Sequence, residues 1–330
     1  MASARRDLAR VRGLSVGHAE SDDGTTGVTV VRFPGPTPAV IDVRGGASAT
    51  YDTASLALDA TFGRRWAIFF AGGSVFGLDA ARGIRAEILA SGGGHHAFSH
   101  PHRVVPVSGA ALFDLPLQEG RLPDYEALGR EATQHASRRP VASGRVGAGA
   151  GAMVGKYLGR HRAMHGGLAS SAASVGRRGT VGVLVVVNAV GAVVDPRTGR
   201  WVAGARTSSG RIAPPGRRWW RGGSARGTTL TLVATDLALD RPALARVASI
   251  VHAGLARTIV PYQTSTDGDV VFAAATGAAG PMPAERVPGT NADRVGAVAA
   301  VRAVSAVLAA VRAGNPPSTD RSRSTPRAGR

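Results

Sequence analysis

Apolar residues recur along this chain at two different periods, and together they predict an α/β protein. Short β-branched runs bounded by Gly or Pro are typical of buried strands, and they cover residues 27–33, 39–43, 66–70, 104–114, 180–187, 228–235 and 270–275. Pro34-Gly35-Pro36 separates the first two runs and predicts a hairpin. Apolar residues at helical spacing predict helices over residues 74–90, 125–138, 241–257 and 291–312, with a weak signal over 51–61.

The sharpest boundary in this pattern lies between Gly227 and Thr228. A loose stretch of Arg, Gly, Pro and Ser stops at Gly227, and Thr228 opens a β-branched strand. One interpretation is an ordinary loop entering a strand, because Thr is favoured in strands. The alternative is that the bond between the two residues is cut. Thr228 would then carry a free α-amine, with a pKa of about 7.7–8.0, able to take the proton of its own hydroxyl. Spacing alone leaves both interpretations open.

The composition limits the classes of protein to consider. The chain has 330 residues, of which 44% are hydrophobic and only 5% aromatic, so a core must be built mainly from Ala, Val and Leu. There is no Cys, which excludes disulfides, thiol catalysis and thiolate metal sites. The longest apolar run, Val181–Val194, contains Asn188 and is too short to span a bilayer. The N-terminal residues lack the apolar segment of a signal peptide. We therefore expect a soluble, cytoplasmic protein without a membrane partner.

The net charge of +18 is concentrated in two segments. Residues 196–226 contain eight Arg and no acidic residue, and the segment from Arg312 onward contains five Arg against Asp320. These segments hold +12 of the total and predict an Arg-rich linker (196–226) and a disordered basic tail (313–330). Basic segments attract phosphates non-specifically, so nucleic acid is an unlikely partner for the folded part.

Two glycine-rich segments are candidates for binding through backbone amides. Ser74 follows Gly72-Gly73 between a predicted strand and helix; a nucleophile elbow would require Gly at position 76, which is Phe76. A helix cap, with amides that hold an anion, is the better interpretation of Ser74.

The second glycine-rich segment is 144–156. It fails as a phosphate-binding loop because Ala150 replaces a required Gly and Tyr157 follows Lys156, and it lacks the context of a dinucleotide fingerprint. We expect the backbone around Gly147, Gly149 and Gly151 to form an oxyanion or substrate loop.

Asn188 and a group of histidines are the remaining polar candidates. Asn188 ends the most apolar strand, where a buried amide must be hydrogen-bonded, although it could also form a turn. His95, His96, His100 and His102 flank glycines with no adjacent carboxylate, which favours a surface loop over a metal site. We expect neither a metal nor another cofactor.

Taken together, these segments resemble the self-processing L-aminopeptidase/D-esterase family of the DmpA and BapA type. The match extends in order over roughly residues 11–280, and the matching segments are Val43–Gly46, Gly72–Asp79, Val146–Ala152, Val187–Ala189, Thr228–Thr229, Val233–Asp236 and Asp267–Phe272.

The resemblance implies a four-layer α-β-β-α sandwich, as in the DmpA and ornithine acetyltransferase type. A single catalytic domain over residues 1–312 would be cut into an α chain (1–227) and a β chain (228–330). Thr228 would be the nucleophile and its amine the base, Asn188 would contribute to the oxyanion hole, and Asp267 and Asp269 would orient the nucleophile. Asp267 also fits a plain Asp-Gly turn. The resemblance further implies a homo-oligomer of cleaved units.

The function expected from this resemblance is an aminopeptidase, amidase or esterase that acts on small peptides, amides or esters through an acyl-Thr intermediate. Two alternatives remain open at this point. The same fold could transfer the acyl group to an amine such as ornithine, or an uncleaved, non-catalytic chain could bind nucleic acid through its basic segments.

Overall fold

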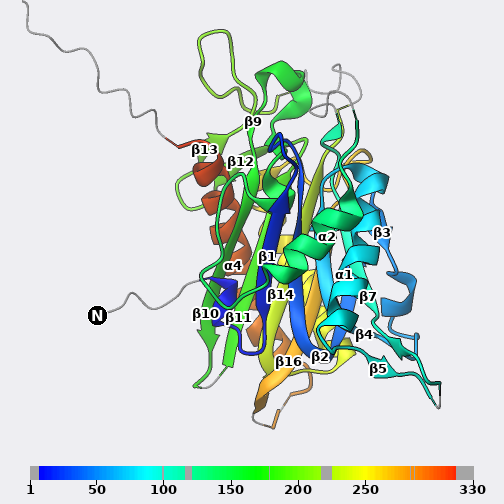
Figure 1. Ribbon diagram of the computed structural model, residues 1–330. Coiled ribbons are helices and arrows are strands. Elements are labelled where there is room, and N and C mark those ends of the chain that lie inside the picture. The colour runs from blue at the N-terminus through cyan, green and yellow to red at the C-terminus, as the bar shows by residue number, and fades with distance from the viewer. Residues whose placement is uncertain are drawn as a thin grey trace, which may run out of the picture.

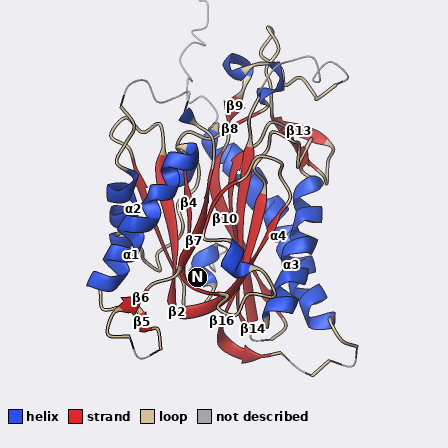
Figure 2. Cartoon of the chain, turned by 90° about the vertical axis from the view of Figure 1, so that its right-hand side faces the viewer, coloured by secondary structure: helices blue, strands red, loops and turns tan. Residues whose placement is uncertain are grey.

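One continuous nine-stranded sheet folds at a shared strand into two halves, called here the first and second sheets, which lie face to face between two pairs of helices. This gives the four-layer α-β-β-α sandwich that the family resemblance implies (Figures 1 and 2). The computed structural model describes residues 7–98, 100–115, 121–177, 179–216, 225–282, 284–285 and 287–316. Predicted features at 217–224 and 317–330, which include part of the Arg-rich linker and most of the basic tail, lie outside these residues.

The first sheet contains a parallel pair joined by a helix. Strands β4 (Arg64–Ala71) and β7 (Val107–Ala111) are parallel, and α1 (Ala80–Ala90) lies between them in sequence. The sheet is completed by β1 (Ser15–Glu20), β3 (Ala49–Tyr51) and the first part of β2 (Gly27–Val43). Helix α2 (Tyr125–Gln134) packs beside α1, and both helices cover the outer face of the first sheet.

The second sheet also contains a parallel pair of strands joined by a helix, and Thr228 lies in one of these strands. Strands β14 (Thr228–Ala238) and β16 (Val270–Pro281) are parallel and are joined through α3 (Arg241–Ala256). The Asp240 side chain accepts a hydrogen bond from the Ala243 nitrogen, and Pro242 lies in the first turn, so this helix begins where the sequence predicts. Antiparallel strands β11 (Gly179–Asn188) and β10 (Gly167–Val175) extend the sheet beyond β14, and α4 (Thr290–Gly314) packs on them.

Strand β2 connects the two sheets, and the hairpin predicted at Pro34–Pro36 is wrong. The strand runs through both prolines; its first part pairs with β1 and β4, and its last part, from Ala39, pairs with β16. The pairing with β4 is irregular between Arg32 and Thr37. Proline has no N–H to donate, so it is tolerated at the point where the ladder is interrupted.

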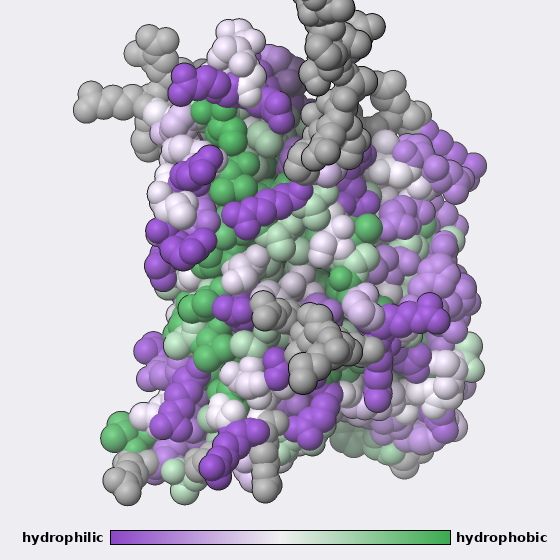
Figure 3. All heavy atoms as spheres, turned by 90° about the vertical axis from the view of Figure 1, so that its left-hand side faces the viewer, coloured by the Kyte–Doolittle hydropathy of each residue, from purple (hydrophilic) through white to green (hydrophobic). Residues whose placement is uncertain are grey.

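Three buried clusters fill the spaces between the layers. One lies between the two sheets, one between the first sheet and α1 and α2, and one between the second sheet and α3 and α4. Helix α4 is long and apolar enough to cross a membrane by length and composition, but residues such as Val295, Ala303 and Val307 belong to the third cluster, which is typical of a core helix. The face of the molecule on which α4 and β10 lie shows a band of hydrophobic surface (Figure 3).

Several smaller elements differ from the sequence prediction. The weak helix over 51–61 is only a 3-10 turn at Ala54–Leu56. Part of the segment expected to be an irregular linker forms β13 (Arg200–Ala203), which pairs with β12 (Ala192–Asp195). Helix α4 has Gly289 at its N-cap position rather than Thr290 or Asn291. The remaining short strands are β5 (His95–His96), β6 (Arg103–Val104), β8 (Met153–Val154), β9 (Met164–His165) and β15 (Ile259–Val260).

Candidate active site

Thr228 is the first residue of β14 and lies between two neighbouring strands of the second sheet. Asn188, the last residue of β11, is its direct partner on the antiparallel side. On the parallel side, Gly227 forms a bridge with Asp267, just before β16. Thr228, Asn188, Asp267 and Asp269 are each at most 3% exposed. The strand register therefore brings together four of the residues predicted from the sequence.

Both backbone polar groups of Gly227, the residue before Thr228, are hydrogen-bonded to the segment that precedes β16. The Gly227 nitrogen donates to the Thr266 oxygen at 3.1 Å, and the Gly268 nitrogen donates to the Gly227 oxygen at 2.9 Å. The Thr228 hydroxyl donates to the same Gly227 oxygen. The hydroxyl thus contacts the preceding carbonyl group, and one N–H already points at the oxygen on which negative charge would develop in an attack.

Asp267 and Asp269 fix the backbone around this bond and do more than form a turn. Asp269 accepts hydrogen bonds from the Thr229 nitrogen at 2.6 Å and from the Gln263 nitrogen at 2.8 Å. Asp267 accepts from the Val190 nitrogen at 3.1 Å and from the Thr264 hydroxyl. Burial, followed by the charge of Asp267, raises the pKa of Asp269 to about 7.

Asn188 has a fixed orientation. Its Oδ1 accepts from the Met153 nitrogen and from Lys156 Nζ, both at 2.9 Å, and its Nδ2 donates to the Phe113 oxygen at 3.2 Å. Because two donors meet Oδ1, the assignment of oxygen and nitrogen in this amide follows from its hydrogen bonds.

Lys156 also lies at this site, although the sequence analysis did not single it out as a site residue. Its amine donates to the Asn188 backbone oxygen at 2.7 Å as well as to Oδ1. Burial is the main cause that lowers the pKa of Lys156 to about 7, against the opposing effect of Asp267. One feature of the sequence could have drawn attention to it: Lys156 is the only lysine in the sequence, and all other cationic side chains are Arg or His. Arg cannot lose its proton in a protein, whereas a buried Lys can.

A cavity of about 320 Å³ opens beside Thr228. Small side chains dominate its wall, which is formed by Ala47, Ala49, Ser74, Ala111, Phe113, Arg226, Gly227, Thr228, Ser265 and Thr266. Ser74 therefore belongs to the site, but the prediction that its side chain caps a helix is wrong. The N-cap position is occupied by Gly73 without a side-chain cap, and Ser74 itself has a φ of 56°.

The Gly147–Gly151 segment does not line this cavity, contrary to the role predicted for it. The Gly147 nitrogen donates to Glu20, and the Gly149 nitrogen donates to the Val146 oxygen at 2.8 Å. Gly151 lies against the Thr25 carbonyl and Asp114. These three glycines are packed against other parts of the chain rather than against the cavity. Met153 and Lys156, which follow the segment, reach the site through their hydrogen bonds to Asn188.

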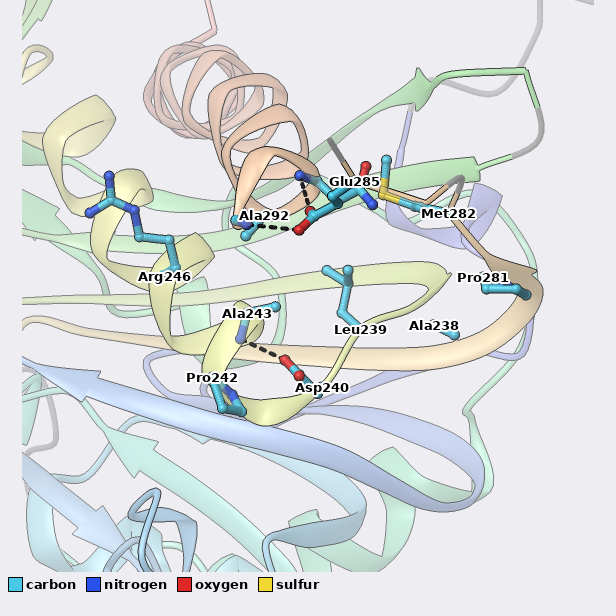
Figure 4. Close-up of a pocket in the computed structure, with 12 residues that line it drawn as sticks. Ala238, Leu239, Asp240, Pro242, Ala243, Arg246, Pro281, Met282, Glu285 and Ala292 are labelled. Carbon is cyan, nitrogen blue, oxygen red and sulfur yellow. Dashed lines mark hydrogen bonds between the residues drawn. The ribbon is translucent and has the colours of Figure 1, made fainter. Parts of the chain in front are cut away.

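A second cavity, of about 470 Å³, lies at the opposite end of β14, and its polar groups serve another purpose (Figure 4). Asp240 accepts from Ala243 at the start of α3, and Glu285 accepts from the Gly289 and Asn291 nitrogens at the start of α4. Both carboxylates cap helices, which makes this cavity a weaker candidate than the one at Thr228. Within the described part of the chain, no group of three or more His, Asp or Glu is placed to hold a metal.

The comparisons with known proteins agree with this fold. The sequence model of peptidase family S58 matches residues 7–324. The chain belongs to peptidase family S58. It is therefore a peptide hydrolase, and the resemblance found in the sequence is confirmed.

Several individual proteins are similar to this chain in sequence or in structure. An uncharacterized aminopeptidase of Mycobacterium bovis is 37% identical and covers 91% of this chain and 90% of its own length. A 6-aminohexanoate-oligomer endohydrolase of Kocuria is 30% identical and covers 91% of this chain and 84% of its own length. The structure of the L-aminopeptidase D-Ala-esterase/amidase of Ochrobactrum anthropi, described as a variant of the Ntn-hydrolase fold, superposes with a TM-score of 0.66 at 20% identity. It covers 92% of this chain and 85% of the other. This last likeness confirms the fold of the S58 chain.

Proposed function

We propose that this S58 peptidase cuts its own Gly227–Thr228 bond and then acts as an aminopeptidase with Thr228 as nucleophile. The observation that carries the proposal is the contact of the Thr228 hydroxyl with the Gly227 carbonyl group, whose oxygen accepts the Gly268 N–H. Attack of Oγ1 on the carbonyl carbon moves the acyl group from nitrogen to oxygen. Water then hydrolyses the ester and releases the Gly227 carboxylate and the free Thr228 amine.

In turnover, the new amine takes the hydroxyl proton while Oγ1 attacks the carbonyl carbon of a substrate amide. The proton passes to the leaving amine, and water releases the acyl group from Thr228. Before cleavage this amine does not exist, so another base is needed. The neutral form of Lys156, close to Asn188, is our candidate for that first step.

The direct test measures hydrolysis of glycyl-p-nitroanilide by the purified protein, with N-acetylglycyl-p-nitroanilide as the control. An aminopeptidase acts on substrates with a free amine, and the Thr266 oxygen that accepts the Gly227 N–H could accept from such an amine, so we expect the glycyl compound to be hydrolysed and the acetylated compound to be resistant. Added ornithine should leave the rate and products unchanged. Acyl-ornithine as the main product would instead indicate an acyltransferase, and absence of turnover would reject the proposal.

Removal of the Asn188 amide should reduce turnover strongly. Asn188 is the direct cross-strand partner of Thr228, and we infer that its Nδ2 also stabilises the developing oxyanion. Asn188→Ala should lower kcat on the order of 10²–10³-fold, the usual effect of losing one oxyanion donor. Steady-state kinetics together with a thermal melt separate this from a turn residue, whose loss would lower the Tm and leave kcat of the folded protein intact.

The dependence of kcat on pH should show which group acts as the base. A terminal amine loses its proton at about pH 7.7–8.0, and the pKa of Asp269 is raised to about 7. Both groups are in their proton-accepting form only above these values, so kcat should rise as the pH increases through about 7–8 and then level off. A flat profile across that range would remove the amine from the role of base.

We also propose that the cleaved protein forms a homo-oligomer. The exposed apolar band in Figure 3 lies on the α4 face, and Val301 of that helix is 51% exposed. Light scattering should give a mass of at least two cleaved units, and the mass of one unit would contradict this.

A further inference from the structure

A buried histidine that the proposed reaction does not use lies behind the loop that holds Asp269. His252 is on α3 and is 1% exposed. Its Nδ1 lies 2.9 Å from the Tyr262 hydroxyl and 3.1 Å from Gln263 Nε2, and its Nε2 lies 3.2 Å from the Asp42 carbonyl oxygen. Both ring nitrogens therefore contact polar groups, which fixes the orientation of the ring.

The surroundings of this ring select one of its neutral tautomers. Burial is the main cause that lowers the pKa of His252 to about 4, against the opposing effect of Asp42 and with a smaller contribution from Arg44. The ring is therefore neutral near pH 7. A carbonyl oxygen can only accept a hydrogen bond, so the proton lies on Nε2, which faces Asp42, and Nδ1 is the acceptor. The Tyr262 hydroxyl and the Gln263 amide both act as donors toward Nδ1.

Gln263 connects this histidine to the active site through its backbone. Its φ of 63° lies in the left-handed region, which a glutamine rarely adopts unless its surroundings hold it there. Its side chain contacts His252, and its backbone nitrogen donates to Asp269 Oδ2 at 2.8 Å. Asp269 Oδ1 accepts in turn from the nitrogen of Thr229, the residue after Thr228, at 2.6 Å. The contact between the glutamine side chain and the ring thus holds the N–H that orients the Asp269 carboxylate.

We propose that His252 is a positioning residue of the active site, which acts through Gln263 on the Asp269 carboxylate and so on the backbone next to Thr228. This inference rests on the proposed function, because it requires Asp269 to act together with Thr228. Burial raises the pKa of Asp269, and the Gln263 N–H is one of the groups that lower it. Loss of this donor should raise the pKa of Asp269 further and displace its carboxylate. Substrate binding should change less, since neither His252 nor Gln263 is among the described residues that line the cavity.

The test compares His252→Leu with the wild-type enzyme in the hydrolysis of glycyl-p-nitroanilide, with kcat expressed per cleaved molecule. Leucine fills a similar volume and removes both ring nitrogens. We expect kcat at pH 7 to fall about tenfold and KM to stay within about twofold, because an orienting group acts mainly in the transition state. The rise of kcat with pH should also move to higher pH, since Asp269 would lose its proton later. His252→Asn, which keeps an acceptor near the position of Nδ1, should recover most of the activity and of the pH profile.

Gln263→Ala provides an independent measurement at a partly buried position. It removes the amide that contacts Nδ1 and should reproduce the effects of His252→Leu. The double variant should lose no more activity than either single variant, because both changes remove the same contact. Thr235→Val is the control: it removes a buried hydroxyl that donates to the Thr180 oxygen at the other end of β14. It should lower the Tm and leave kcat and the pH profile unchanged.

A thermal melt and intact mass give the folded and cleaved fractions of each variant. Slower self-cleavage of a folded variant would support the same role, because Asp269 holds the backbone next to the cut bond. If His252→Leu does not fold, Gln263→Ala alone decides. A lower Tm as the only effect, or losses that add in the double variant, would overturn the inference and leave the proposed function intact. A wild-type protein without turnover would overturn both.

Discussion

Thr228→Ala is expected to remain a single chain of 330 residues and to hydrolyse no substrate. The variant removes the oxygen that contacts the Gly227 carbonyl group, and no other described hydroxyl is seen to donate to that carbonyl. The wild-type protein should instead separate into fragments of residues 1–227 and 228–330. Intact mass after prolonged incubation distinguishes the two outcomes, and a p-nitroanilide assay follows turnover. The expected loss is complete within detection, because the same atom acts in both reactions.

Two further variants make this result specific. Thr228→Ser keeps a hydroxyl at the same carbon and should still cleave. Thr231→Val, on the same strand, removes a buried hydroxyl that finds no hydrogen-bond partner among the described residues, and should behave as wild type. Cleavage of Thr228→Ala at Gly227 would remove Thr228 from the mechanism, and a wild-type protein that stays intact would argue against self-processing altogether.

Many strands and helices were predictable because local patterns agree with the final environment, whereas the four-layer arrangement was expected only from the family resemblance. β11 and β14 are almost entirely buried, and their sequences are continuous apolar or β-branched runs. Asp240 and Pro242 marked the start of α3 through a cap that needs no tertiary contact. The course of β2 was not predictable in this way, since Pro34 normally ends a strand. Its tolerance here depends on partners that lie far away in sequence.

The site was predicted only in part, for a related reason. Thr228 stands at a visible boundary, and Asp267 and Asp269 were placed by the family resemblance, but their hydrogen bonds depend on strand register. The glycines at 147–151 were expected to offer free amides, whereas the Gly147 and Gly149 amides are used inside the protein. The contacts of Lys156 depend on its burial, and no local pattern shows that a lysine after a glycine-rich segment will be buried beside Asn188.

Replacement of Lys156 should have the second largest effect and should also change how stability depends on pH. Lys156→Met keeps the length of the side chain and removes the amine that donates to Asn188. If that amine is the base for the first cleavage, self-cleavage should slow by at least about 100-fold, within the range of a lost general base. Intact mass against time measures this. Lys156→Arg should be equally slow, because a guanidinium stays charged. Arg162→Met, an exposed cation nearby, should cleave normally.

The stability of the two proteins should diverge in a defined pH window. The pKa of Lys156 is lowered from 10.5 to about 7 in the folded protein, mainly by burial. Between these values the unfolded chain holds the proton and the folded chain does not, so the contribution of Lys156 to the free energy of unfolding increases as the pH rises from about 7 to 10.5. Its slope is about 1.4 kcal/mol per pH unit within the window.

Lys156→Met lacks this contribution. Both proteins are measured in the Thr228→Ala background, so that each unfolds as a single uncleaved chain. The difference in unfolding free energy between Thr228→Ala and Thr228→Ala/Lys156→Met, obtained from urea titrations at pH 7, 8 and 9, should therefore shift steadily in favour of the protein that keeps Lys156. A difference that is constant with pH would mean that Lys156 stays charged in the folded protein, and it would then be unable to serve as the base.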